Sequence, residues 1–441
     1  MNNKDLLPRI AFLFGLAFLA YLFGFSTAHF RLFPHDFLVT AFEQGKQVQQ
    51  QKVDIQSHHI HPARHDFAGV VRREGAAVEP GVVLVSSYWP DFEWGPGLRL
   101  LDRDGNVLHR WDANPLRLWP TSPHRDDLGD FFHTRTNYVH GTHLFENGDV
   151  MVNIEYHGLV RMNAAGEVLW RLDHRTHHSI TPNERGNFWV SSAYWRSDPA
   201  DVAKRFPGLL PPVSEETALE VTPGGEVVRE VSVLASIFGH PELRRAIWML
   251  WQSRTGDITH MNDVEELPSS MAAAYPSLRA GDLMISCKHL DLVFIMDPAT
   301  LAVRWWRIGP FSKQHDPDFL GDGTISVYDN NSDGSLDGAF LGGSRLLRIA
   351  IGSGVVETLY PRDQAGERRF YSEVGGKAQR LANGNWMLIE PRAGRVFEVD
   401  PTGRTVWEWV HERHGKDMMC EVLEGAVYPL DPERARGWSR R

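Results

Sequence analysis

The chain has 441 residues, of which 42% are hydrophobic and 23% are charged, a composition typical of a globular protein. Its formal net charge is -10, and this acidic balance argues against nucleic-acid binding, which needs a clustered basic surface. The 21 histidines are more informative, because imidazole is the side chain best suited to act as acid, base, nucleophile or metal ligand near neutral pH.

The N-terminal residues predict a membrane segment. Residues 10–25 are apolar apart from their glycines and Tyr21, and Lys4 and Arg9 precede them. With residues 26–28 the run approaches the ~20 residues that cross a bilayer. We expect residues 1–30 to anchor the chain in the inner membrane by a transmembrane helix, with the rest on the periplasmic side. A signal peptide cleaved after the small residues 26–28 is the alternative.

Residues 31–75 follow as a predicted stalk or linker, with a Gln-rich polar helix in its first part. His58, His59, His61 and His65 lie in its second part and form a weak candidate for metal binding, because histidines in such a loop are usually solvated. The cysteines are Cys287 and Cys420, and neither belongs to a CxxC pair, which argues against a zinc–thiolate site. They predict either one disulfide or two buried thiols.

One structural unit recurs six times within residues 76–430. Its second half is an alternating strand, a turn rich in Asp, Pro, Gly or Asn, and another strand, at 98–111, 158–172, 217–231, 291–308, 344–360 and 394–410. Its first half is a glycine that opens a hydrophobic strand, at Gly81, Gly148, Gly186, Gly281, Gly323 and Gly384. Units this small must stack to bury their faces, and a radial stack makes a propeller. The sequence therefore predicts an all-β, six-bladed β-propeller after a transmembrane helix and a short helical stalk.

Insertions between the copies, at 196–216, 232–258 and 361–370, predict loops or short helices over one face of the propeller. Residues 242–252 have the pattern of an amphipathic helix, which we expect to lie over the pocket or against the membrane surface.

Histidines occupy one register position of the repeat. Eight residues before the repeat glycine stand His140, His178 and His315. His260 has the same lead-in place in the fourth unit, and Lys377 lies near it in the sixth. Segments that lead into inner strands meet near the propeller axis, so four imidazoles should converge, with Lys288 at the far end of an inner strand. Clustered imidazoles and an ammonium repel one another and lose solvation, so their grouping predicts a functional pocket.

Such a pocket suits an oxyanion, because its donors are neutral or cationic and a sulfate or phosphate ester presents oxygens to them. One imidazole can attack as a nucleophile while another moves protons. The same histidines could instead bind a metal in a lyase or hydrolase, or remain in a non-catalytic membrane-tethered scaffold.

Two weaker signals remain. Tyr88 and Tyr194 recur in similar aromatic segments and could stack on an aryl substrate at the pocket mouth. Asp329, Asn331 and Asp333 match the first half of a calcium loop, but Phe340 stands where the closing glutamate belongs, so a hydrogen-bonded turn is the alternative.

Three stretches together resemble the arylsulfate sulfotransferase family, most closely over about residues 130–350. They are HMNDVEEL (260–267), GDLMISCKHLDLVFIMDPATLAVRWWRIG (281–309) and FSKQHDPDFLGDGTISVYDNNSDG (311–334). The resemblance implies an exported six-bladed propeller that transfers a sulfuryl group from a small-molecule aryl sulfate to a phenol through a sulfohistidine. It implies no nucleotide donor and no cofactor.

The resemblance also implies roles for particular residues. His315 would be the nucleophile, His260 and Asn262 would bind the sulfuryl group and handle protons, and His178 would bind sulfate oxygens. Lys288 stands where the family has arginine, so it offers a point charge rather than a bidentate fork. His140 lies outside these motifs, and its place in the pocket is predicted from the repeat register alone.

Overall fold

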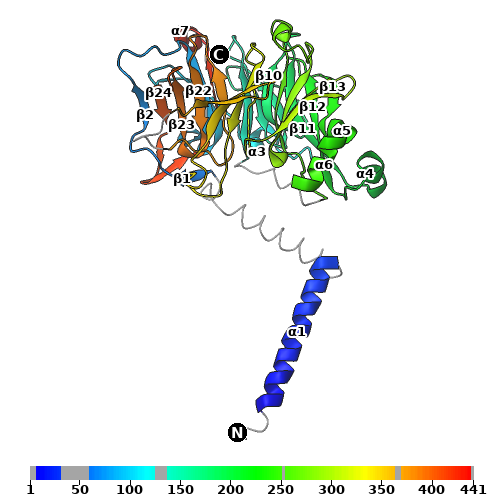
Figure 1. Ribbon diagram of the computed structural model, residues 1–441. Coiled ribbons are helices and arrows are strands. Elements are labelled where there is room, and N and C mark those ends of the chain that lie inside the picture. Colours follow the sequence, from blue (N-terminus) through cyan, green and yellow to red (C-terminus); the bar gives the residue numbers. More distant parts are fainter. Residues whose placement is uncertain (1–5, 31–58, 125–136, 251–253, 363–368, 439–441) are drawn as a thin grey trace. The chain divides into compact units, whose positions relative to one another are not determined.

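A computed structural model of the chain describes residues 6–30, 59–124, 137–250, 254–362 and 369–438 (Figure 1). Contacts divide the chain into two units, Met1–Ser57 and His58–Arg441. The boundary falls within the predicted stalk, whose helical first part lies outside the described residues. Its second part contributes two strands to the second unit, β1 (Ile60–Pro62) and β2 (Gly69–Arg72).

In the first unit, α1 (Leu6–Phe30) is a helix of 25 residues that coincides with the predicted apolar segment. Its aromatic side chains are largely exposed, for example Phe12 at 70% and Phe14 at 73%. None of the described helices has the length and apolar character required to cross a membrane. The membrane anchor stays a prediction.

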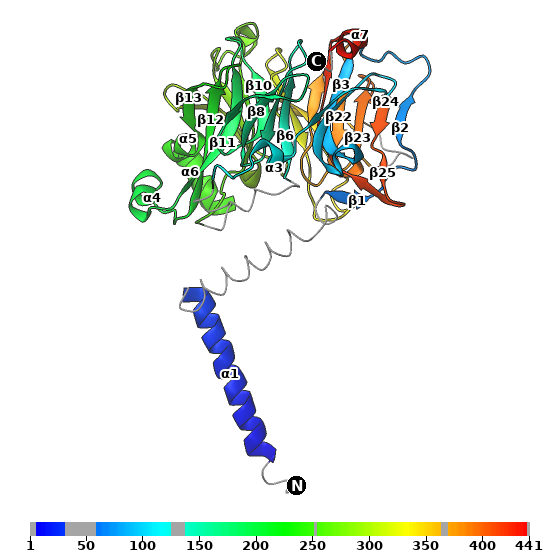
Figure 2. The same cartoon turned by 180° about the vertical axis from the view of Figure 1, so that it is seen from behind.

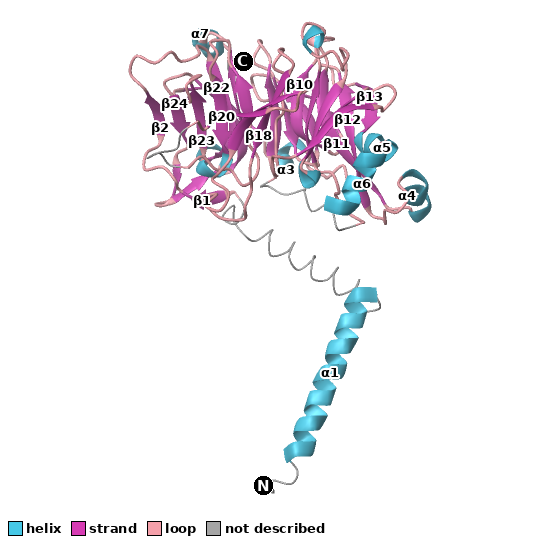
Figure 3. Cartoon of the chain, viewed as in Figure 1, coloured by secondary structure: helices cyan, strands magenta, loops and turns pink. Residues whose placement is uncertain are grey.

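The second unit consists mostly of strands (Figure 3). In its described residues these strands form six antiparallel sheets that follow one another along the chain, together with one small sheet. The first contains β27 (Val422–Tyr428), β3 (Val82–Trp89), β4 (Gly95–Leu101) and β5 (Val107–Asp112). The second contains β6 (Val139–Leu144), β7 (Val150–Ile154), β8 (Gly158–Met162) and β9 (Val168–Leu172). The third contains β10 (Thr176–Pro182), β11 (Phe188–Arg196), β12 (Val213–Val221) and β13 (Val227–Ser232).

The fourth sheet contains β14 (Met261–Glu266), β15 (Leu283–Cys287), β16 (Leu292–Met296) and β17 (Val303–Ile308). The fifth contains β18 (Thr324–Asp329), β19 (Arg345–Ala350) and β20 (Val356–Tyr360). The sixth contains β21 (Ala378–Arg380), β22 (Trp386–Glu390), β23 (Arg395–Val399), β24 (Thr405–Val410) and β2. A small additional sheet joins β1 to β26 (Met418–Cys420) and β25 (Arg413–His414).

These sheets confirm an all-β, propeller-like fold. All six predicted hairpins are formed, and each repeat glycine precedes a strand. The first strands of neighbouring sheets also contact one another in a continuous series. The contacting pairs are Glu424–Gly141, His140–His178, Ser179–Val264, Gln314–Asn262, Asp316–Ala378 and Gln379–Val427. The series returns to the first sheet, so these strands surround a common centre.

One detail of the predicted register is wrong. The glycine-opened strands, expected to be innermost, are second in every sheet but the fifth, because the segments before them are strands as well. In β10 the pairing breaks between His177 and Ile180, and in β6 it breaks between Val139 and Thr142. In the fifth sheet only the bridges His315–Tyr328 and Phe319–Ile325 mark the innermost segment. Such irregular pairing hides the alternation by which a strand is recognised in sequence.

Because all strands of a sheet alternate in direction, the connections fall on two opposite faces. We define the entry face as the end at which the innermost strands begin. It carries the connections from second to third strand and from each sheet to the next. The insertions therefore lie there as α3 (Pro115–Leu118), α4 (Pro199–Arg205), α5 (Val233–Gly239) and α6 (Pro241–Leu250). Figures 1 and 2 show these helices along one edge of the sheets, with α7 (Pro432–Arg436) at the other edge.

The core consists of apolar layers between neighbouring sheets. Trp189 and Trp407 are fully buried in two of these layers, and α5 adds Leu234 and Ile237 to the layer between the third and fourth sheets. Cys287 and Cys420 are both buried and free, so the two-thiol alternative is confirmed and the disulfide is wrong.

Candidate active site

Three of the predicted histidines meet where the innermost strands begin. The ring centres of His140 and His178 are 4.5 Å apart, and those of His178 and His260 are 5.2 Å apart. Lys288 extends the row, with its Nζ 3.4 Å from Nε2 of His260. Three separate sheets thus deliver three imidazoles and one ammonium to one region. We call these four side chains, together with His315, the histidine cluster.

The backbone beneath this cluster is bent to bring the side chains inward. His178 and His260 have φ angles of 52° and 46°, in the left-handed region that non-glycine residues rarely occupy. Gly141 is required beside them, because a Cβ there would lie 1.6 Å from the carbonyl oxygen of His178. Strain of this kind is usually retained where it positions functional groups.

His315 is held in one tautomer. Its Nδ1 lies 2.7 Å from Oδ1 of Asn330, whose Nδ2 donates to the carbonyls of Ser372 at 2.9 Å and Gly375 at 2.6 Å. Because the Asn330 amide group donates to two carbonyls, its oxygen must face the imidazole and accept the Nδ1 proton. Nε2 of His315 therefore carries the lone pair. Burial and the charge of Lys288 also lower the pKa of His315 well below 6.5, so the ring is neutral.

His260 is oriented by a carboxylate. Oδ2 of Asp257 accepts from Nδ1 of His260 at 2.6 Å, and Oδ1 accepts from its backbone amide at 2.8 Å. His289 stacks near His260 with ring centres 4.6 Å apart, and its Nδ1 bonds to the carbonyl of Asp257. Burial and then Lys288 lower the pKa of His260. Burial likewise lowers the pKa of Lys288, which makes its ammonium group a stronger acid.

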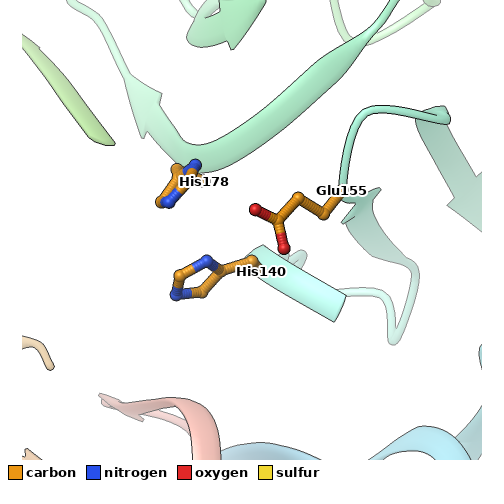
Figure 4. A group of neighbouring side chains, drawn as sticks. All are labelled: His140, Glu155 and His178. Carbon is orange, nitrogen blue, oxygen red and sulfur yellow. The ribbon is translucent and has the colours of Figure 1, made fainter. Parts of the chain in front are cut away.

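A glutamate completes this side of the cluster. Glu155 faces His140 and His178, and the ligand atoms of all three lie within 4.8 Å of one another (Figure 4). Burial raises the pKa of Glu155 to about 7, although the nearby His177 and Lys288 partly oppose this rise. A carboxyl group with this pKa can hold or accept a proton at neutral pH.

A second layer of charged groups lies behind the cluster, away from the entry face. Lys377 Nζ is 2.8 Å from Asp316 and 3.9 Å from Asp263. Nε2 of His140 is 3.9 Å from Glu424, whose pKa is raised by burial to about 7. These groups separate the histidines from a cavity of about 900 Å³ at the far face, which residues such as His143, Arg348 and Arg380 line. None of the four histidines of the cluster lines this cavity.

Two groups within the described residues have the composition of a metal site. Asp257, His260 and His289 form one, and His140, Glu155 and His178 form the other. In the first, hydrogen bonds within the group already occupy Asp257 and one nitrogen of each histidine. In the second, the positive charge of Lys288 acts on both His140 and Glu155, which disfavours a further cation.

The other predicted site residues have different surroundings. Asn262 donates through Nδ2 to the carbonyl of Gln314 at 2.7 Å, directly beside His315 in the chain. Tyr88 is fully buried and stacks on His59, with ring centres 4.3 Å apart. The ring centres of Tyr194 and His174 are 6.3 Å apart. Both tyrosines thus contact histidines outside the cluster.

The weak metal candidates form internal contacts instead. Asp329 accepts from Arg345 at 2.9 Å, and Asp333 accepts from the amides of Phe340 and Leu341. The side-chain Nδ2 of Asn331 donates to the backbone carbonyls of Leu341 and Gly343. Of the two predicted alternatives, a calcium loop and a hydrogen-bonded turn, the contacts of this loop are those of the turn. His59 and His61 both bind the buried carboxylate of Glu421, at 2.7 and 3.2 Å, while His58 lies outside the described residues.

Sequence reasoning missed Glu155, Asp257 and Glu424. Glu155 has a visible signal, because it is the seventh residue after its repeat glycine, as Lys288 is after Gly281. Asp257 lies in an insertion, and Glu424 belongs to the last strand of the ring, so neither stands at a repeated position.

The sequence model of the arylsulfotransferase (ASST) family matches residues 141–413, well over half of the chain. The chain belongs to this arylsulfotransferase family. The matched segment includes His178, His260, Lys288 and His315, whereas His140 stands one residue before it. No curated protein matches the chain.

Among solved structures, a protein of unknown function from Bacteroides caccae is 13% identical, with a TM-score of 0.46 over 75% of this chain and 93% of that one. TolB from Acinetobacter baumannii is 11% identical, with a TM-score of 0.42 over 78% and 66% of the two chains. The WD40 β-propeller domain of Doa1 is 12% identical, with a TM-score of 0.39 over 80% and 86%. At this level of similarity none of them informs the chemistry of the arylsulfotransferase-family site.

Proposed function

We propose that this arylsulfotransferase-family chain is a six-bladed propeller that transfers a sulfuryl group from an aryl sulfate to a phenol through a sulfohistidine on His315. The observation that carries the proposal is the hydrogen bond from Nδ1 of His315 to Asn330, which leaves the lone pair of a neutral ring on Nε2. Family membership supports sulfuryl transfer, and the orientation of His315 supports its role as nucleophile.

In the first step, Nε2 of His315 forms a bond to sulfur while the bond from sulfur to the aryl oxygen breaks. The sulfuryl oxygens carry negative charge, which the ammonium of Lys288 and an N–H donor in the cluster stabilise. The departing aryl oxide takes a proton from the Lys288–His260 pair, whose nitrogens are 3.4 Å apart. The products are the free phenol and His315 with the sulfuryl group on Nε2.

In the second step, the oxygen of an acceptor phenol attacks sulfur and the bond from sulfur to Nε2 breaks. The phenolic proton returns to the His260–Lys288 pair, directly or by way of the Glu155 carboxylate, and this restores the starting protonation state. Because each half-reaction moves one proton in the opposite sense, the overall transfer neither consumes nor releases protons. No nucleotide or external oxidant is needed.

The test is to incubate the full chain with a chromogenic aryl sulfate and to search for an added sulfuryl group by mass spectrometry. We expect the mass to localise to His315, and we expect His315→Ala to abolish both the label and turnover with added phenol. His143→Ala is the matched control, because His143 lies on the same strand as His140 but lines the far cavity. Labelling that persists in His315→Ala removes His315 from its role.

A metal-dependent lyase or hydrolase is the second candidate; the close grouping of His140, Glu155 and His178 supports it, and the nearby charge of Lys288 opposes it. Metal analysis of the purified chain separates the two functions. One zinc or iron per chain, lost in Glu155→Gln together with activity, would support the metal enzyme.

We also propose that the chain is exported and held at the inner membrane through residues 1–30. The exposed aromatic side chains of α1, such as Phe12 and Phe14, support this proposal. Fractionation of cells, with N-terminal sequencing of the mature chain, distinguishes an anchor from a cleaved signal peptide. Recovery of the intact chain in the cytosol would contradict both.

A further inference from the structure

Exposed apolar side chains gather on the entry face. In the described part of the second unit, twelve large hydrophobic residues are exposed, and seven of them lie in connections of this face. The seven are Leu116, Leu210, Trp248, Met249, Leu336, Phe340 and Leu341. Most of the others lie on strands, and Val355 stands in a turn of the far face. Scattered exposed residues are ordinary, whereas this one-sided distribution calls for a cause.

The residues with the greatest exposure stand on two connections. In the turn between β18 and β19, Leu336 is 84% exposed, Phe340 is 79% exposed and Leu341 is 58% exposed. The turn is ordered by Asp333, which accepts from the amides of Phe340 and Leu341 at 2.9 and 3.0 Å. The fold thus holds these apolar side chains outward in a fixed turn.

The second connection contains α6. Leu243 and Ile247 face the core, whereas Trp248 is 41% exposed and Met249 is 69% exposed. The ring of Trp248 packs over Gly208, within 3.1 Å of where a Cβ would stand, which joins α6 to the loop that presents Leu210. Basic residues accompany this patch, with Arg244 and Arg245 exposed on α6 and Lys204 exposed on α4. Apolar side chains beside exposed cations are the combination that binds an anionic bilayer surface.

The chain also enters the second unit on this face. Its first strand, β1, pairs with β26, which lies in the connection that leads into β27. β1, the first strand of the second unit, therefore lies at the entry face.

We propose that the entry face docks on the surface of an anionic lipid bilayer, with Trp248, Met249, Phe340 and Leu341 inserted among the lipid headgroups. The histidine cluster lies at the same end of the sheets, since the innermost strands begin there, and His140 and His260 retain 15% exposure of their side chains. Resting on the proposed function, this placement assigns the substrate class: the acceptor is an amphipathic phenol that resides in the bilayer.

The test of docking uses the full chain with single cysteines. The native cysteines are buried, so Met249→Cys and Leu341→Cys can be labelled selectively with a fluorophore that brightens in an apolar environment. Val355→Cys is the matched control, because this residue is 65% exposed on the far face. The probe is a vesicle of phosphatidylcholine and phosphatidylglycerol.

We expect the labels at 249 and 341 to brighten on mixing with these vesicles and to be quenched by nitroxide-bearing lipids, while the label at 355 changes in neither respect. Attachment through α1 alone would leave all three labels alike, and that result overturns the proposal. A response at 355 that equals those at 249 and 341 overturns it as well.

The substrate class is tested by turnover with a long-chain 4-alkylphenol held in vesicles and with phenol in solution. We expect Trp248→Ser combined with Met249→Ser to lower the rate with the alkylphenol and to leave the rate with phenol unchanged. Equal rates of this variant and the parent chain with the alkylphenol overturn the substrate class. Absence of turnover with both phenols in the parent chain refutes the proposed function, while the fluorescence result still decides docking.

Discussion

Replacing Glu155 by glutamine should make the protein more stable and less active. Glutamine has nearly the same shape as glutamate but carries no charge, so the substitution removes the ionised form and little else. A carboxyl pKa raised from 4.5 to about 7 means that ionisation costs the folded state about 3 kcal/mol. This cost is absent below pH 4.5, grows between pH 4.5 and 7, and is fully present above pH 7.

We therefore expect Glu155→Gln to raise the free energy of unfolding by about 1 to 3 kcal/mol at pH 8 and by much less at pH 5. The lower end allows for the partial exposure of Glu155. Chemical denaturation of both proteins at the two pH values measures the difference. Glu167→Gln is the control, since Glu167 is exposed in the same sheet and should show no gain at either pH.

Activity should change in the opposite direction. If Glu155 accepts the phenolic proton, the rate of the parent chain rises as pH increases through about 7, because the group must be ionised. Glu155→Gln should lose this rise and fall by roughly 10²-fold in rate, the lower range for a general base. If the gain in unfolding free energy of Glu155→Gln over the parent chain is no larger at pH 8 than at pH 5, the reasoning about the buried charge is refuted.

Three further changes test neighbouring parts of the site. Asn330→Leu should lower turnover by about 10-fold, because the Nδ1 proton of His315 loses its acceptor, and ¹⁵N NMR of His315 should show a mixture of tautomers. Lys288→Arg should keep part of the activity, because arginine also binds sulfate oxygens but does not release a proton, whereas Lys288→Met should lose roughly 10²-fold in the rate of labelling; equal rates for both would exclude a role for the charge. Burial opposes ionisation of Glu421, but the bonds from His59 and His61 lower its pKa to about 2, so its contribution of about 3 kcal/mol is present above pH 4.5 and lost as pH falls toward 2. Glu421→Gln should therefore destabilise the chain at pH 7 and much less at pH 2, as thermal unfolding at both pH values will show.

The repeat made most of the fold predictable. Six similar hairpins cannot bury their apolar faces separately, so the sequence predicts a radial array. The register of the repeat alone places His140, His178 and His260 together. The innermost strands were not recognised as strands, because the left-handed backbone at His178 and His260 interrupts their alternation. The backbone distortion that turns the imidazoles inward thus also removes the alternation of residues by which a strand is predicted.

Groups outside the repeat could not be found in this way. Asp257 reaches His260 from an insertion, and its partnership depends on a local bend that no periodic pattern encodes. Glu424 lies 283 residues from Gly141, to whose amide it bonds, and only closure of the ring brings the two together.

The site can form only after the ring of sheets has closed. The first sheet takes its innermost strand from Val422–Tyr428, so synthesis of nearly the whole chain must precede its completion. Until then Val82–Trp89 presents an unpaired edge, and His140 lacks the carboxylate of Glu424 beside it. A chain released early from the ribosome, or clipped before residue 422, would retain every histidine of the cluster and still have no chamber to hold them.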